Sequence, residues 1–101
     1  MLPSNEYTDL ALGASGNNYT APANGYFYIS ALGTASNNWI EMQNISASSF
    51  ARGVYGTIKW GFKIAIEAKK GDSVNISYVN IKTDGVFRFI YAEGQSSIIK
   101  I

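Results

Sequence analysis

Carboxylates are the main candidates for catalytic side chains in this sequence, because histidine and cysteine are both absent. Their absence removes the usual general base, the Ser–His and Cys–His nucleophile pairs and most ligands of zinc. Two carboxylates ~5–9 Å apart are enough for glycoside hydrolysis, and Glu41, Glu67, Asp84 and Glu93 are candidates by elimination. Most acidic residues, however, stand beside turn glycines or alternate along a polar strand face, as solvated or turn-stabilising carboxylates do. We therefore predict that the protein is not an enzyme.

Metal and cofactor sites have little support in the sequence. Asp72, Asp84 and the pairs Asn17–Asn18 and Asn37–Asn38 offer oxygen ligands, but they form no series of fixed spacing like that of a calcium loop. The glycines stand singly at turns, and none opens a phosphate-binding loop before a helix. We predict no metal and no cofactor.

Two aromatic residues flank loops rich in Asn and Ser, a composition that suits sugar binding. Trp39 and Tyr55 are these residues, and a flat ring stacks on a sugar while amides bind its hydroxyls. The candidate receptor-binding residues are Asn37, Asn38, Trp39, Glu41, Arg52 and Tyr55. The alternative is that Trp39 belongs to the core.

The elements that must position these residues are strands. Residues 57–68 alternate strictly, with apolar side chains at the even positions, which predicts a long half-buried strand. Further strands are predicted at 6–12, 26–32, 39–44, 73–79 and 86–91, with a short or irregular one within 45–55. Turn signals recur about every ten residues. This pattern predicts an all-β fold, an antiparallel β-sandwich that is jelly-roll-like, with seven to eight strands.

Two of the predicted strands are apolar on both faces. Tyr26 and Tyr28 lie on one of them, and Phe87, Phe89 and Tyr91 lie on the other. One face of each strand can fill the sandwich, and the other then needs separate cover. A neighbouring subunit would supply it, so these five residues are the predicted oligomer interface. The alternative is that a loop covers the rings or that the tyrosine hydroxyls meet water.

Length and composition predict one domain over residues 1–101 that shares part of its surface with partners. The sequence is 47% hydrophobic and 15% charged, so neutral polar residues and partner contacts must cover much of the exterior. The net charge of +1 lacks the basic stripe that nucleic-acid binding needs. No apolar run suggests membrane insertion. The first residues lack the basic and apolar segments of a signal peptide, which predicts synthesis in the cytoplasm.

Four colinear segments resemble the C-terminal head domains of bacteriophage and prophage tail fibres. They are residues 7–16 (YTDLALGASG), 19–26 (YTAPANGY), 70–72 (KGD) and 87–94 (FRFIYAEG). The resemblance implies a small jelly-roll-like knob, similar to the trimeric heads of the tumour-necrosis-factor and C1q class. Such a knob stands at the tip of a fibre in the virion and touches the host surface. The resemblance carries over no catalytic residue and does not fix the receptor-binding residues.

The sequence and the resemblance together favour a receptor-binding head that acts as a homotrimer. The expected receptor is a glycan or an outer-membrane protein of the host cell, and three weak sites on one head would raise the overall affinity. The alternative is a structural capsid or tail component that cements neighbouring subunits. A glycosidase is the third hypothesis.

Overall fold

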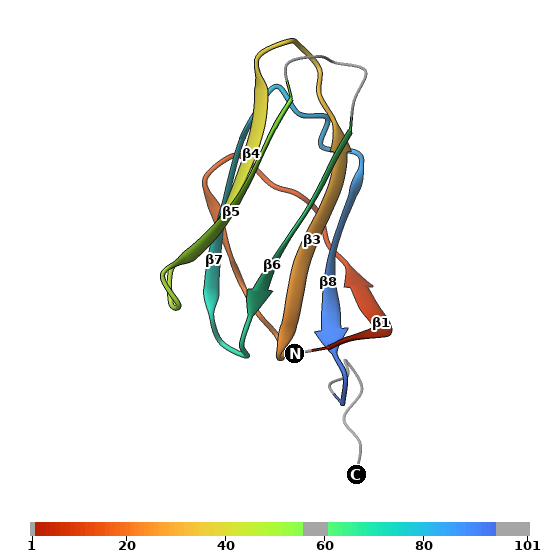
Figure 1. Cartoon of the computed structure of the whole chain (residues 1–101), viewed down its shortest axis with the longest axis vertical. Helices are drawn as coiled ribbons and strands as arrows, with labels where there is room; N and C mark the ends of the chain where they lie inside the picture. Colours follow the sequence, from red (N-terminus) through yellow and green to blue (C-terminus); the bar gives the residue numbers. More distant parts are fainter. Residues whose placement is uncertain (1, 56–60, 95–101) are drawn as a thin grey trace.

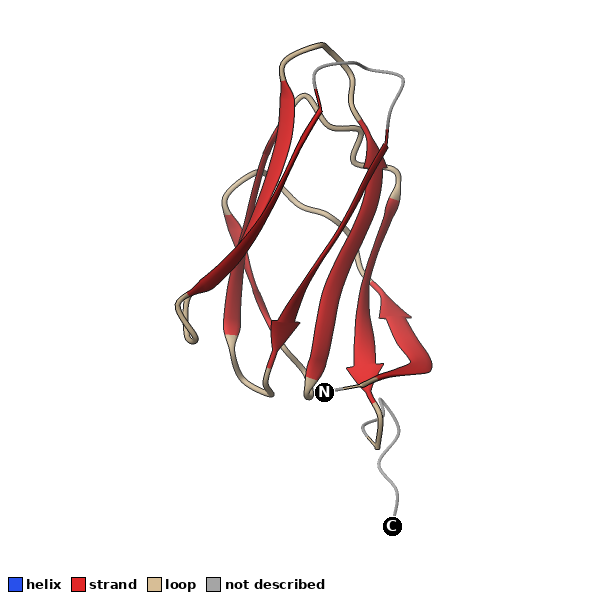
Figure 2. Ribbon diagram, in the orientation of Figure 1, coloured by secondary structure: helices blue, strands red, loops and turns tan. Residues whose placement is uncertain are grey.

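The computed structural model describes residues 2–55 and 61–94. Every regular element in these ranges is a β-strand (Figure 2). The described chain contains no helix long and apolar enough to cross a membrane.

Within the described residues, eight strands form two four-stranded antiparallel sheets that pack face to face (Figure 1). The strands are β1 (Pro3–Asp9), β2 (Asn17–Thr20), β3 (Gly25–Leu32), β4 (Asn38–Asn44), β5 (Ser49–Tyr55), β6 (Gly61–Ala68), β7 (Ser73–Val79) and β8 (Val86–Ala92). The first sheet has the order β1-β8-β3-β6, and the second has the order β2-β7-β4-β5. Strands 1 and 8, 2 and 7, 3 and 6, and 4 and 5 are therefore paired. This is the pairing of a long hairpin rolled into a jelly roll, so the predicted fold class is confirmed.

The predicted alternation along residues 57–68 is confirmed for the part that the structure describes. In β6 the side chains of Ile64, Ile66 and Ala68 are buried, while Lys63 and Glu67 are exposed. Residues 57–60 lie outside the described residues. The strand pairs with β3 over its whole described length, so its apolar side faces the second sheet.

Aromatic rings from both sheets fill the centre of the sandwich. Phe27 on β3 and Phe89 on β8 meet edge to face, with ring centroids 5.0 Å apart. Phe89 also contacts Tyr91 in the same manner at 5.2 Å, and Phe87 contacts Tyr19 of the second sheet at 5.0 Å. Such contacts add ~0.5–1.5 kcal/mol each to the burial of apolar area, so this cluster is a main source of stability.

Two predicted strand boundaries differ from the structure, and one predicted strand is more regular than expected. The first strand ends at Asp9 rather than at residue 12, because Leu10 and Leu12 pack against the core without a place in the sheet. No strand is predicted at Asn17 and Asn18, which begin β2. The short or irregular strand predicted within residues 45–55 is the regular strand β5. Its small residues show no apolar alternation, and its pairing with β4 supplies the order.

The chain makes a tight turn after β6. Gly71 has φ of 88°, a conformation that glycine adopts without a Cβ clash. The turn returns the chain into β7 and brings Asp72 beside the end of β4.

Candidate functional site

The outer face of the second sheet carries two of the predicted receptor-binding side chains. Along β4 the side chains alternate, and the inward ones are Asn38, Ile40, Met42 and Asn44. Trp39, Glu41 and Gln43 therefore point outward. Trp39 is half-buried on this outer face rather than in the core, which corrects the alternative interpretation of Trp39 as a core residue.

Strand register places a third predicted residue beside these two. Glu41 pairs with Arg52 of β5 on one side and with Ser77 of β7 on the other. Trp39, two residues before Glu41 on the same face of β4, pairs with Val54 of β5 and with Val79 of β7. Tyr55 pairs with Asn38, which is one of the inward positions of β4 and not one of the outward positions that include Trp39 and Glu41. The side chains of Arg52 and Tyr55 lie outside the described part of the structure.

Asn38 and Asn37 differ in what they offer to a ligand. Asn38, a predicted receptor-binding residue, is only 1% exposed and donates a hydrogen bond from Nδ2 to the Ala35 carbonyl at 2.7 Å. It packs so closely under Gly33 that a Cβ there would lie 2.5 Å from its Nδ2. The prediction is therefore wrong for Asn38, which holds the β3–β4 loop in place. Asn37 is exposed, and its carbonyl accepts a bond from Asn80 Nδ2 at 2.6 Å.

The predicted oligomer interface divides into core and surface. Phe87, Phe89 and Tyr91 are 4%, 0% and 3% exposed, so the chain itself covers them and a second copy cannot reach them. The interface prediction is wrong for these three rings. Tyr26 and Tyr28, in contrast, lie half-buried on the outer face of the first sheet.

Further side chains join these two tyrosines on what we call the tyrosine face. This face consists of Tyr7, Tyr26, Tyr28, Arg88 and Ile90. Ile90 pairs with Tyr7 on one side and with Tyr26 on the other, and Arg88 pairs with Tyr28. Tyr7 is 50% exposed. The sequence analysis missed Tyr7 and Arg88. Arg88 alternates with the buried rings Phe87 and Phe89, and such alternation indicates a side chain on the opposite face of the strand.

The charges of the tyrosine face are matched within the chain. The Arg88 guanidinium carbon lies 3.9 Å from the centroid of the Tyr7 ring, and its Nε lies 3.2 Å from Asp9 Oδ1. Burial raises the pKa of Tyr26. The negative charge of Glu67, and the hydrogen bond that this carboxylate accepts from the Tyr26 hydroxyl, raise it further. The positive charge of Arg88 is stacked on the Tyr7 ring and balanced by Asp9. The tyrosine rings around this pair therefore present apolar surface next to a pair with no net charge.

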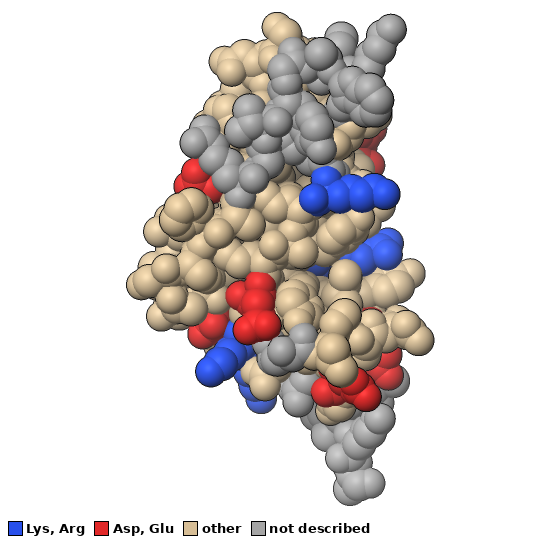
Figure 3. All heavy atoms as spheres, in the orientation of Figure 1, with Lys and Arg blue, Asp and Glu red and all other residues tan. Residues whose placement is uncertain are grey.

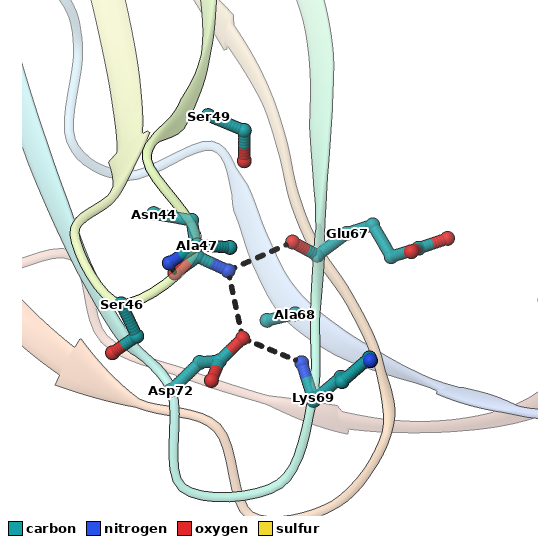
Figure 4. Close-up of a pocket in the computed structure, with 8 residues that line it drawn as sticks. All are labelled: Asn44, Ser46, Ala47, Ser49, Glu67, Ala68, Lys69 and Asp72. Carbon is teal, nitrogen blue, oxygen red and sulfur yellow. Dashed lines mark hydrogen bonds between the residues drawn. The ribbon is translucent and has the colours of Figure 1, made fainter.

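A polar hollow of about 350 Å³ lies between the turn after β4 and the turn after β6 (Figure 4). Asn44, only 1% exposed, donates from Nδ2 to Asp72 Oδ2 at 3.0 Å and to the Glu67 carbonyl at 3.2 Å. Asp72 Oδ2 also accepts from the Lys69 amide at 3.0 Å. The bonds from Asn44 and then from Lys69 lower the pKa of Asp72. Asn44 Oδ1 accepts from the Ala47 amide at 3.0 Å, so this network ties two turns together.

The carboxylates considered for catalysis or metal binding are dispersed. Glu41 and Glu67 lie on opposite outer faces of the sandwich, and Asp84 and Glu93 lie beyond opposite ends of β8. Glycoside hydrolysis needs two carboxylates ~5–9 Å apart, and neither of these two pairs lies on one side of the sandwich as that distance requires. Within residues 2–55 and 61–94, no three acidic, histidine or cysteine side chains gather where they could hold a metal ion.

Charged side chains are sparse on the face of the molecule that Figure 3 displays. Acidic and basic groups stand there in small separate clusters of both signs, with uncharged surface between them. This distribution agrees with the net charge of +1.

No protein-family model, no curated protein and no solved structure matches this chain.

Proposed function

We propose that this chain is a non-enzymatic head domain at the tip of a phage tail fibre, where it binds a host-cell surface receptor as a homotrimer. The receptor is a glycan or an outer-membrane protein. The observation that supports this proposal best is the outer face of the second sheet. There Trp39 and Glu41 lie side by side on β4 among neutral polar neighbours such as Gln43 and Ser77. A half-exposed ring with carboxylate, amide and hydroxyl groups around it is suited to binding a polar surface ligand.

The tyrosine face supports the homotrimer. Tyrosine and arginine are enriched in protein interfaces, where their large side chains contribute most of the binding energy. Because Arg88 is paired with Asp9 and stacked on Tyr7, a neighbouring copy would meet ring surface rather than an uncompensated charge. Trimerisation would display three receptor sites on one rigid head and raise the overall affinity through effective concentration.

Truncation of Trp39, on the outer face of the second sheet, is expected to weaken binding to cells. Trp39→Ala should reduce adsorption of the labelled chain to a panel of bacterial strains about tenfold or more, because truncation of a central aromatic commonly costs ~1.4 kcal/mol or more. Leu32→Ala is the control, since Leu32 is 49% exposed and belongs to the first sheet. Equal adsorption of the two variants and the parent chain would contradict the assignment of this face.

The tyrosine face is expected to hold the copies together. Static light scattering at micromolar concentration should give the mass of a trimer, and the double variant Tyr26→Ala with Tyr28→Ala should give a lower mass. Trp39→Ala should leave the trimer intact because it lies on the opposite sheet. A monomeric parent chain would refute the trimer, and a trimer that survives the double variant would refute this interface.

A structural virion component that cements neighbouring subunits is the second candidate. It is favoured by the exposed apolar side chain of Leu2, which precedes β1 and is 69% exposed, since such a side chain suits a permanent contact. Removal of the domain from virions separates the two functions. Intact particles that no longer adsorb support the receptor head, whereas failed assembly supports the cementing role.

A further inference from the structure

Four outward side chains form a row across all four strands of the second sheet. From β2 to β5 they are Asn18, Asn75, Gln43 and Phe50, each paired directly with the next. Directly paired residues of antiparallel strands place their side chains on the same face. With strands ~4.8 Å apart, the row is ~14 Å long. We call these four residues the amide row.

Part of the amide row is held in place by its own hydrogen bonds. Asn75 Nδ2 donates to Asn18 Oδ1 at 2.8 Å and to the Gly16 carbonyl at 2.7 Å. The Ser77 hydroxyl donates to Asn75 Oδ1 at 3.1 Å. These bonds fix the orientation of the Asn75 and Asn18 amides, which reduces the entropy that a ligand would lose by ordering them.

The other end of the amide row offers groups that the chain leaves to solvent. Gln43 is exposed, and its side-chain amide makes no hydrogen bond to any residue that the structure describes. Phe50, on the edge strand β5, is 71% exposed, which is unusual for a large apolar ring at the end of a polar row. A flat ring and a free amide therefore lie next to each other on the same face.

We propose that the amide row binds an uncharged oligosaccharide, which lies across the strands with one sugar ring stacked on Phe50. An amide donates and accepts hydrogen bonds at once, as a sugar hydroxyl does, so Gln43 and Asn18 can satisfy several hydroxyls. The inference rests on the proposed function, and it names the class of receptor and the residues that contact it.

The charges of this face favour a neutral ligand over an acidic one. The amide row contains no ionisable group, and an ionised sugar bound there would lose hydration without gaining a counter-charge. In the adjacent row, Glu41 pairs with Arg52, so that row carries one residue of each charge and adds no net charge that would attract an acidic sugar.

The position of the amide row also favours a sugar over an extended peptide. A peptide that adds to a sheet does so at a strand edge, where free backbone groups pair with it. The amide row runs across the face instead, perpendicular to the strands, and presents side chains only. Stacking and side-chain hydrogen bonds are then the available forces.

The test is a microarray printed with neutral and acidic bacterial surface polysaccharides, probed with the labelled full-length chain. The parent chain should bind neutral polysaccharides, and Phe50→Ala and Gln43→Ala should each reduce that binding about tenfold or more. Ile45→Ala is the matched control, because Ile45 is 50% exposed near the same turn but outside the row. It should bind as the parent chain does. Equal thermal unfolding of all variants excludes misfolding as the cause of a loss.

Several outcomes would overturn the inference. They are binding to acidic polysaccharides alone, binding to no printed polysaccharide, or parental binding by both Phe50→Ala and Gln43→Ala. Adsorption to bacterial strains, measured in parallel, separates this failure from that of the proposed function. A chain that adsorbs to cells but binds no polysaccharide keeps its role as a receptor head and points to a protein receptor. A chain that does neither loses both assignments.

Discussion

Phe89→Ala is expected to lower the free energy of unfolding by about 3–5 kcal/mol, a large part of the total stability of a small domain. Phe89 is 0% exposed and its ring meets those of Phe27 and Tyr91 edge to face. Truncation removes its buried area and leaves a cavity that the two sheets cannot close, because both are held by their strand pairing. Urea denaturation followed by tryptophan fluorescence measures the change.

Val86→Ala is the control for this prediction. Val86 lies on the same strand but is 37% exposed, so its truncation should change the free energy of unfolding by less than ~1 kcal/mol. The comparison also separates a core role from an interface role. If Phe89 served mainly as a contact between copies, Phe89→Ala would change the oligomeric mass while leaving stability nearly unaltered, and our assignment of this ring to the core would be wrong.

The fold was predictable because most strands show their inward side directly. In β6 a period of two separates Ile64 and Ile66 from Lys63 and Glu67, and only a half-buried strand places such a set on one face. In β8 both sets of side chains contain apolar residues, so periodicity alone cannot choose the inward one. Size and charge decide there: the large rings fill the core, and Arg88 must reach solvent and Asp9.

The outer face of the second sheet was only partly predictable, for a similar reason. Trp39 and Asn38 are neighbours in the sequence, and both were predicted to bind the receptor. The strand includes Asn38, so the period of two places its side chain inward with those of Ile40 and Met42, and the Trp39 side chain outward. The predicted strand began at Trp39, so this pattern was not applied to Asn38.

The amide row could not be found from sequence motifs. Asn18, Gln43, Asn75 and Phe50 belong to four strands that are separated along the chain, and only the register of the pairs aligns them. Single sequences carry little information on register between distant strands, because it depends on how the whole sandwich closes. The composition rich in Asn and Ser suggested a polar binding surface, but it did not indicate which amides meet.

Asn44→Ala is expected to lower the free energy of unfolding by about 2–3 kcal/mol, since a buried polar group that loses its partner carries a penalty of this order. The side chain bonds Asp72, the Glu67 carbonyl and the Ala47 amide. Its loss releases the turn after β4 from the turn after β6. Asn18→Ala is the control, because Asn18 is exposed and bonds only Asn75 among the described residues, and it should cost about 0.5 kcal/mol or less. Urea denaturation at neutral pH compares the two.

The pH dependence of stability tests the same network independently. The bond from Asn44 is the largest cause of the lowered pKa of Asp72, so the folded state holds the carboxylate charged at pH values where the unfolded chain, with a pKa near 3.8, takes up a proton. Asp72 therefore stabilises the fold above pH 3.8, and this contribution is lost as the pH falls through the lower pKa of the folded state. Asn44→Ala brings the two pKa values closer, so its stability should fall less steeply than that of the parent chain over this acidic range. Asp72→Asn should show the same shallow slope, whereas a slope equal to that of the parent chain in both variants would mean that other carboxylates govern acid unfolding.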